Sequence, residues 1–270
     1  MSKPICNRLF KLGLIFTTLI VLPCLSYAET GLPWSSSFEN GDNSEWNGFT
    51  RGTVSYTRQN PVDGAYAAYT TLVANTLNNN YLEHYFGDHV RIGLEKVEEV
   101  YLEFSSKFEQ GYTFPERQGH KLALINLTDG NTTDRRYQVY IVVDGNNQYA
   151  ITYSDIGDWT FRGLDQNVGT RETVRFDQWD RLKMYVRLNT PGSSDGIVRM
   201  WINGELKLDH SGLNLRENTD FGMNKLILSS YTAHESGSNG VQWYDHWLLS
   251  ETDPVAVDIS PPSPPILQSN

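Results

Sequence analysis

The feature of this sequence that most constrains its fold is the residue-by-residue alternation of apolar and polar side chains. The segment "EVYLEFSSKF" (99–108) alternates in this way, and so do "RYQVYIVVD" (136–144) and "WDRLKMYVRLN" (179–189). A period of two residues is typical of β-strands that bury one face. The apolar positions that we expect in the core are Val100, Leu102, Phe104, Phe108, Tyr137, Val139, Ile141, Val143, Leu182, Met184, Val186 and Leu188.

Turn sequences separate these strands at short intervals. "DGNN" (144–147), "NTPGSSDG" (189–196) and "SGSNG" (236–240) are rich in the residues that favour turns. Asn203-Gly204 suits a two-residue hairpin turn. Because hardly any segment has a helical period, the pattern predicts an all-β fold, a two-sheet antiparallel jelly-roll sandwich.

The N-terminal residues 1–28 have the composition of a secretory signal peptide. Three basic residues precede the apolar run "LGLIFTTLIVL", and the small-x-small sequence "SYA" ends at Ala28. We therefore predict cleavage after Ala28 and a secreted protein, periplasmic or extracellular, with no membrane span in its mature form. Lipoprotein processing at Cys24 is the alternative.

The rest of the chain divides into a body and a tail. Residues 255–270 are rich in Pro and Ser and are interpreted as an extended tail or linker. The predicted jelly-roll domain is therefore 29–254, long enough to be stabilised by burial as one domain. Both cysteines, Cys6 and Cys24, fall within the signal peptide, so the sequence predicts no thiolate chemistry in the mature protein.

Charge is unevenly distributed along the chain. The full sequence has 22 Lys and Arg against 32 Asp and Glu, a net charge of −10, and loss of the signal peptide removes three of the basic residues. Basic side chains nevertheless gather between Arg117 and Arg136, together with His120 and Lys121. A local positive field on an acidic protein favours an anionic ligand, and we expect this ligand not to be nucleic acid. We also expect the protein to be a monomer.

Two strands carry basic, aromatic and amide side chains on the face opposite their core positions. Alternation puts Gln138 and Tyr140 with Arg136 on one strand, and it puts Lys183, Tyr185 and Arg187 together on another. We expect these faces to line a groove that binds a long anionic chain. The alternative is that they are ordinary solvated strand residues, since charged side chains are common on exposed sheets.

Several segments, taken in order, resemble the concanavalin A-like jelly-roll polysaccharide lyases, especially the glucuronan-lyase and alginate-lyase groups. The similar segments are "FENGDNSEWNGF" (38–49), "YLEHYFGDH" (81–89), "EEVYLEFSSKFEQGYTF" (98–114), "GHKLALINL" (119–127), "WDRLKMYVRLNTPGSSDGIVRMWINGELKL" (179–208) and "WYDHWLLSE" (243–251). "GHKL" resembles the "GGKLPG" strand of one alginate-lyase group, in which the lysine faces the cleft. Here His120 replaces the second glycine of that motif.

The resemblance implies cleavage of a 4-linked uronic acid chain by β-elimination. In this reaction one group neutralises the C6 carboxylate, a base removes the C5 proton, and an acid protonates the departing oxygen. The catalytic candidates are Lys121 or His120 as base, Arg136 as neutraliser and Tyr140 as proton donor; Gln138 is a further neutraliser candidate and Tyr185 a further proton-donor candidate. The substrate-binding candidates are Arg117, Gln138, Lys107, Lys183, Tyr185 and Arg187.

The resemblance demands no metal and no cofactor, although the loop "DGNNQ" (144–148) is a possible structural calcium site. No pair of carboxylates has the pattern expected of a retaining glycoside hydrolase. The alternative to a lyase is a non-catalytic carbohydrate-binding module of the LamG type, which the Pro-rich tail would tether.

Overall fold

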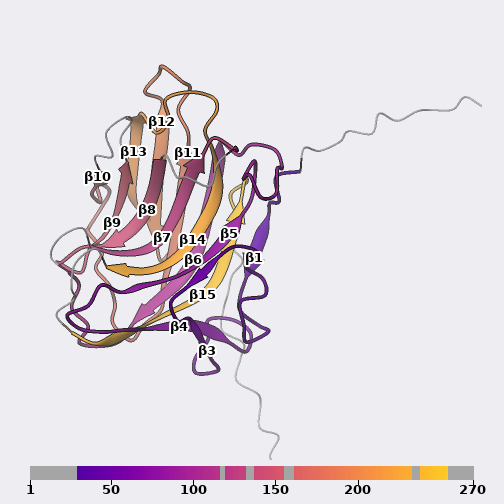
Figure 1. Ribbon diagram of the computed structural model, residues 1–270. Helices are drawn as coiled ribbons and strands as arrows, with labels where there is room; N and C mark the ends of the chain where they lie inside the picture. Colours follow the sequence, from indigo (N-terminus) through magenta and orange to yellow (C-terminus); the bar gives the residue numbers. More distant parts are fainter. Residues whose placement is uncertain (1–28, 116–118, 132–136, 155–160, 233–237, 255–270) are drawn as a thin grey trace, which may run out of the picture.

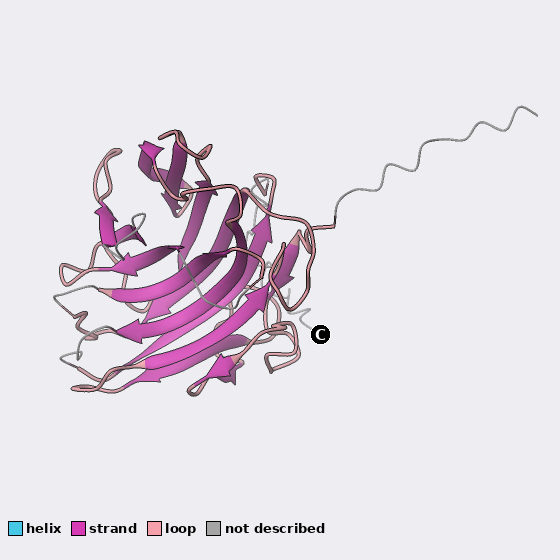
Figure 2. Cartoon of the chain, turned by 45° about the horizontal axis from the view of Figure 1, so that its top comes forward, coloured by secondary structure: helices cyan, strands magenta, loops and turns pink. Residues whose placement is uncertain are grey.

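The protein is a β-sandwich in this computed structural model (Figures 1 and 2). Its described part consists of strands joined by turns and loops, and no helix in that part is long and apolar enough to cross a membrane. The described residues are 29–115, 119–131, 137–154, 161–232 and 238–254. The two antiparallel sheets confirm the predicted all-β jelly-roll sandwich.

One layer is an eight-stranded sheet whose strands follow the order β13-β12-β11-β6-β15-β4-β3, with β1 also paired to β15. Strands β6 and β11 of this sheet carry two of the three alternating segments on which the fold prediction rested. The bounds are β1 Trp34–Ser36, β3 Ser55–Thr57, β4 Ala67–Leu72, β6 Glu99–Phe108, β11 Asp180–Arg187, β12 Gly196–Ile202, β13 Glu205–Leu213 and β15 Gly240–Ser250.

The other layer is a seven-stranded sheet with the order β10-β9-β8-β7-β14-β5-β2. Figure 1 shows β14 in the middle of this layer, with β7 on one side and β5 on the other. The bounds are β2 Thr50–Arg51, β5 Asn79–Tyr85, β7 His120–Thr128, β8 Tyr137–Val143, β9 Tyr149–Ser154, β10 Phe161–Leu164 and β14 Gly222–Thr232.

The apolar faces of the two sheets meet in one core. Near its middle Trp247 of β15 stacks on Phe104 of β6, with ring centroids 4.3 Å apart, and both side chains are buried. Every core position predicted from the alternation is buried. Burying a large apolar side chain stabilises the fold by about 1.5–3 kcal/mol. The buried face of each strand therefore determines which side chains must point outward.

A short ribbon, residues 47–51, forms the edge of the seven-stranded sheet. Its backbone pairs with β5, because the Gly48 amide donates to the Glu83 carbonyl and the Glu83 amide donates to the Phe49 carbonyl, both at 2.9 Å. A Cβ on Gly48 would lie 2.5 Å from the Glu83 carbonyl oxygen, so only glycine permits this approach. The Asn47 side chain extends the pairing by accepting from the Tyr85 amide at 2.7 Å.

Candidate functional site

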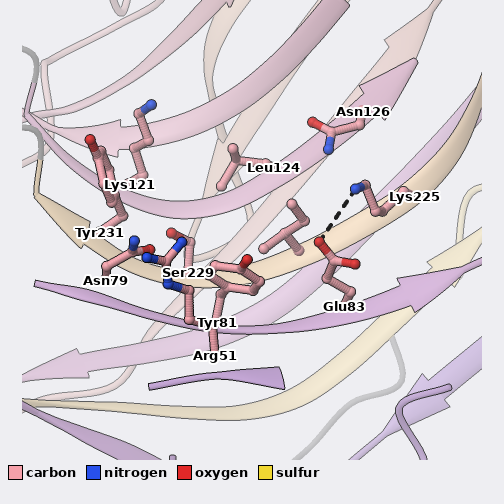
Figure 3. Close-up of a pocket in the computed structure, with 11 residues that line it drawn as sticks. Arg51, Asn79, Tyr81, Glu83, Lys121, Leu124, Asn126, Lys225, Ser229 and Tyr231 are labelled. Atoms are coloured by element: carbon pink, nitrogen blue, oxygen red, sulfur yellow. Dashed lines mark hydrogen bonds and ion pairs between the residues drawn. The ribbon is translucent and has the colours of Figure 1, made fainter. Parts of the chain in front are cut away.

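A groove of about 460 Å³ lies on the outward face of the seven-stranded sheet (Figure 3). Strands β5, β7 and β14 form its floor, and the edge ribbon forms one wall. The groove is lined by Arg51, Asn79, Tyr81, Glu83, Lys121, Leu124, Asn126, Lys225, Ile227, Ser229 and Tyr231. Such a mixture of cations, phenols and amides around an apolar patch suits a sugar polymer that carries negative charge.

Lys121 lies at one end of this groove against two tyrosine rings. Its ammonium nitrogen is 4.6 Å from the ring centroid of Tyr140 and 4.9 Å from that of Tyr231. Tyr231 stands on the neighbouring strand β14 directly across from Lys121, and Tyr140 stands on β8. Cation–π attraction holds the ammonium group between the phenols. The arrangement brings one amine and two phenol side chains together at this end of the groove.

Two amide side chains lie side by side on the floor of the same sheet. The Gln138 amide nitrogen donates to the Asn126 side-chain oxygen at 2.7 Å, because the two residues face each other across β8 and β7. Both are almost fully buried, and the Gln138 side-chain oxygen has no hydrogen-bond partner among the described residues. A buried acceptor without a partner is energetically costly.

An ion pair marks the other end of the groove. Lys225 of β14 lies 3.3 Å from the Glu83 carboxylate of β5, and Glu83 also accepts from the Tyr85 hydroxyl at 2.8 Å. Figure 3 shows Lys225 and Glu83 on the opposite side of the groove from Lys121. Burial, with Glu83 adding to it, raises the pKa of Tyr85 to about 12, so that phenol stays protonated and donates.

The structure brings together some of the candidates that the sequence predicted. Lys121, Gln138 and Tyr140 all lie on the groove face, Gln138 and Tyr140 as the alternation of 136–144 predicted and Lys121 as the resemblance implied. Arg117 and Arg136 lie outside the described residues, so their roles stay predictions.

His120 lies in the interior of the sandwich rather than in the groove, which corrects its predicted placement. Its ring nitrogens pair with the Gln242 side-chain oxygen at 2.6 Å and the Tyr112 hydroxyl at 3.2 Å. Adjacent residues of a strand point to opposite faces, so a groove-facing Lys121 turns His120 inward. Burial lowers the pKa of His120 to about 4, with the Gln242 hydrogen bond opposing.

The other four candidates lie on the outward face of the eight-stranded sheet, away from the groove. Lys183 and Tyr185 pair with Glu103 and Tyr101 of β6 in that sheet, and Arg187 follows them on β11. Lys107 of β6 lies between the rings of Trp179 and Trp243, 4.8 and 4.6 Å from their centroids. Alternation correctly turned these side chains outward, but the sheet to which β6 and β11 belong depends on long-range pairing. The prediction that the outward side chains of β8 and β11 line one groove is therefore wrong.

Several groove residues were missed by the sequence reasoning. They are Arg51, Asn79, Tyr81, Glu83, Asn126, Lys225, Ser229 and Tyr231. A signal was present for those on β14, because "NKLILSSY" buries Leu226 and Leu228 and so turns Lys225 and Tyr231 outward. Nothing local marks Arg51, which reaches the groove through a two-residue edge strand.

The described residues contain no group of three or more His, Cys, Asp or Glu side chains placed to hold a metal ion. In the loop proposed for calcium, the Asp144 carboxylate accepts from the amides of Asn146 and Gln148 at 2.8 and 2.9 Å. This carboxylate closes its own turn.

Comparison with known proteins identifies the family. The family model described as "Polysaccharide lyase" matches residues 38–247, most of the chain. The protein therefore belongs to the polysaccharide lyase family. No curated protein matches the sequence.

Solved structures share the fold at low sequence identity. The endo-β-1,4-glucuronan lyase of the fungus Trichoderma reesei aligns with a TM-score of 0.59 and 17% identity over 81% of this chain and 95% of that one. The alginate lyase of Aplysia kurodai aligns with a TM-score of 0.63 and 10% identity over 83% and 100% of the two chains. An alginate lyase of a Chlorella virus gives 0.56 and 13% over 79% and 95%.

Proposed function

We propose that this protein is a secreted lyase that cleaves a uronic acid-containing polysaccharide by β-elimination in the groove of the seven-stranded sheet. The observation that carries the proposal is the contact of Lys121 with the phenol rings of Tyr140 and Tyr231 inside that groove. Membership of the polysaccharide lyase family supports the reaction type. The glucuronan and alginate lyases that share the fold support a uronic acid substrate.

The groove suits a carboxylated chain in charge and in surface. Arg51 and Lys121 supply positive charge near one end, while Leu124 and Ile227 form an apolar patch with Tyr140 between the two ends. Sugar rings pack their C–H faces on such a patch, and carboxylates interact favourably with guanidinium and ammonium groups.

The side chains divide the steps of the reaction among them. Lys121, in its neutral form, takes the C5 proton, and the electrons of that C–H bond form the C4–C5 double bond as the C4–O bond breaks. Tyr140 gives its proton to the departing oxygen. The proton on Lys121 then returns, through solvent, to the Tyr140 phenolate oxygen, which resets both groups.

The developing charge on the C6 carboxylate needs a stabilising group. Asn126 lines the groove, and its side-chain oxygen accepts from the Gln138 amide, which leaves the Asn126 N–H groups to donate to this charge. Arg136, two residues before Gln138, remains the predicted guanidinium partner. The scheme uses protein side chains only and needs no cofactor.

One experiment separates this function from its alternatives. The purified 29–270 protein is incubated with alginate, glucuronan and glycosaminoglycans while ultraviolet absorbance is followed. A lyase generates an unsaturated product that absorbs. New reducing ends without absorbance would indicate hydrolysis instead, and binding without either product would indicate a carbohydrate-binding module.

Secretion rests on the N-terminal sequence and has its own test. The exported protein is expected to begin at Glu29, which N-terminal mass analysis measures. An exported form that retains residues 1–28, or a lipidated Cys24, would contradict cleavage after Ala28.

A further inference from the structure

A second hollow, of about 340 Å³, lies beside the edge ribbon and the end of β5. It is lined by Asn47, Gly48, Phe49, Tyr85, Arg91 and Ile92. Phe49 is two residues from Arg51 on the ribbon, and Tyr85 is two residues from Glu83 on β5. Alternation therefore puts Phe49 and Tyr85 on the same outward face as the groove. The hollow lies on the same face as the groove, beyond the ion pair of Glu83 and on the side away from Lys121.

The wall of this hollow is held in place from several directions. The Tyr85 hydroxyl donates to Glu83 at 2.8 Å, and its ring stacks on His89 with centroids 4.0 Å apart and planes only 6° from parallel. The Asn47 side chain bonds both backbone groups of Tyr85, at 2.7 and 3.0 Å. A side chain fixed in this way is preorganised, so binding against it loses little conformational entropy.

The hollow also carries exposed groups suited to an acidic sugar. Arg91 is exposed, its backbone amide donates to the His89 ring nitrogen at 3.2 Å, and its guanidinium lies 5.7 Å from the centroid of the Tyr85 ring. Phe49 is 59% exposed, and its ring centroid lies 6.2 Å from that of Tyr81 in the groove. The lining residues include no carboxylate, so the local charge favours an anion.

We infer that this hollow is a distal subsite that binds a second uronate of the same polymer, with Arg91 engaging the carboxylate and Phe49 contacting the sugar ring. The inference rests on the proposed function. Tyr231, the neighbour of Lys121, pairs with Asn79, and Tyr85 lies six residues further along β5. At the rise of a β-strand this is roughly 20 Å, a span of several sugar rings. Only chains long enough to reach both ends gain from the subsite.

The test compares Arg91→Ala with the wild-type 29–270 protein on size-fractionated oligosaccharides and polymer of the uronan that the protein cleaves. A charge-assisted contact of this kind predicts about a tenfold lower kcat/KM on the polymer, through KM, with kcat unchanged. The shortest cleaved oligosaccharides should show no difference. Phe49→Ala should give a smaller loss with the same dependence on length, and Arg91→Lys should recover part of the activity.

Arg58→Ala is the matched control. Arg58 is also exposed and lies over a tyrosine, 4.7 Å from the Tyr66 centroid, but it follows β3 of the other sheet. It should behave as wild type on every chain length. An equal effect of Arg91→Ala on short and long chains, or no effect at all, would overturn the subsite while leaving the lyase function intact.

A different result would count against the proposed function itself, namely that the wild type forms no unsaturated product from any uronan. Calorimetric binding of the same size series then decides the subsite separately. A gain in affinity with chain length that Arg91→Ala removes supports it. The same gain in both proteins, or no binding by either, rejects it.

Discussion

The two outward faces of the sandwich are built from the same kinds of side chain and yet differ in how those side chains are used. On the eight-stranded sheet, three cations each bind a carboxylate of the protein at 2.6–2.9 Å. These pairs are Arg181 with Glu103, Lys183 with Asp253, and Arg199 with Asp209. In the groove of the other sheet, Lys121 contacts two phenol rings, and the ion pair among the described groove residues joins Lys225 to Glu83.

The two faces also differ in the size of their hollows. The hollow around Arg181, Lys183 and Trp201 measures about 140 Å³, against about 460 Å³ for the groove. A cation already neutralised beside a small hollow has little to offer a charged polymer. The comparison teaches that local charge balance and the volume of the hollow, rather than residue type, separate a stabilising sheet face from a binding face.

Replacing one lysine on each face should show the largest difference between the two faces. Lys121→Ala removes the proposed base and should lower the rate of unsaturated product formation by about 10²–10⁴-fold. Lys183→Ala removes a surface ion pair worth about 0–1 kcal/mol and should leave that rate unchanged. Thermal unfolding of both variants should stay near wild type. Equal rate losses in the two would contradict the assignment of the groove as the active site.

Arg136→Ala tests the residue that the sequence places two positions before Gln138. Loss of a group that stabilises the developing charge should reduce turnover by about 10²–10³-fold while the melting temperature hardly changes. Initial rates and a melting curve measured on the same preparation check this. A variant that unfolds but stays active per folded molecule would remove Arg136 from the site.

Salt should distinguish the two faces through binding. Affinity of the wild type for a polyuronate should fall steeply as salt rises, because exposed charge pairs are screened beyond about 10 Å at 0.1 M. Lys121→Gln should flatten this dependence, and Lys183→Ala should leave it as it is. Titrations at several salt concentrations measure the slopes, and salt-insensitive binding of a neutral glucan would argue against a uronate ligand.

A smaller effect concerns three buried histidines. Burial lowers the pKa of His84, His89 and His120 to about 4, so the unfolded chain binds more protons between about pH 4 and 6.5, and stability falls as pH falls through that window. At pH 5.5 the loss is about 1 kcal/mol for each histidine. Burial raises the pKa of Asp245 to about 7, which has the opposite sign.

The melting temperatures of the wild type and His120→Gln at pH 7.5 and 5.5 provide the measurement. The variant lacks one of the titrating groups, so its melting temperature should change less between the two pH values. An identical change in both proteins would show that His120 titrates alike in the folded and unfolded chains.

Individual strands show how much of the structure could be predicted from the sequence. Alternation predicted the buried positions of β6, β8 and β11, because burial of one face is a local property of a strand. The contact of Lys121 with Tyr140 was also within reach, because β7 and β8 are consecutive and pair. The placement of Lys183 was not, because β11 pairs with β6, more than seventy residues earlier in the chain. Long-range pairing leaves no local signal in one sequence.

The edge ribbon also bears on how the folded protein avoids association. An open sheet edge offers unpaired backbone groups on which another chain can add a strand and begin aggregation. Here a two-residue strand and the Asn47 side chain occupy part of that edge of β5, and Gly48 allows the approach. A bulkier residue at position 48 would lift the ribbon from β5. The groove wall would then be shorter, and the unpaired backbone edge of β5 would be open to another chain. One glycine therefore links substrate binding to resistance against aggregation.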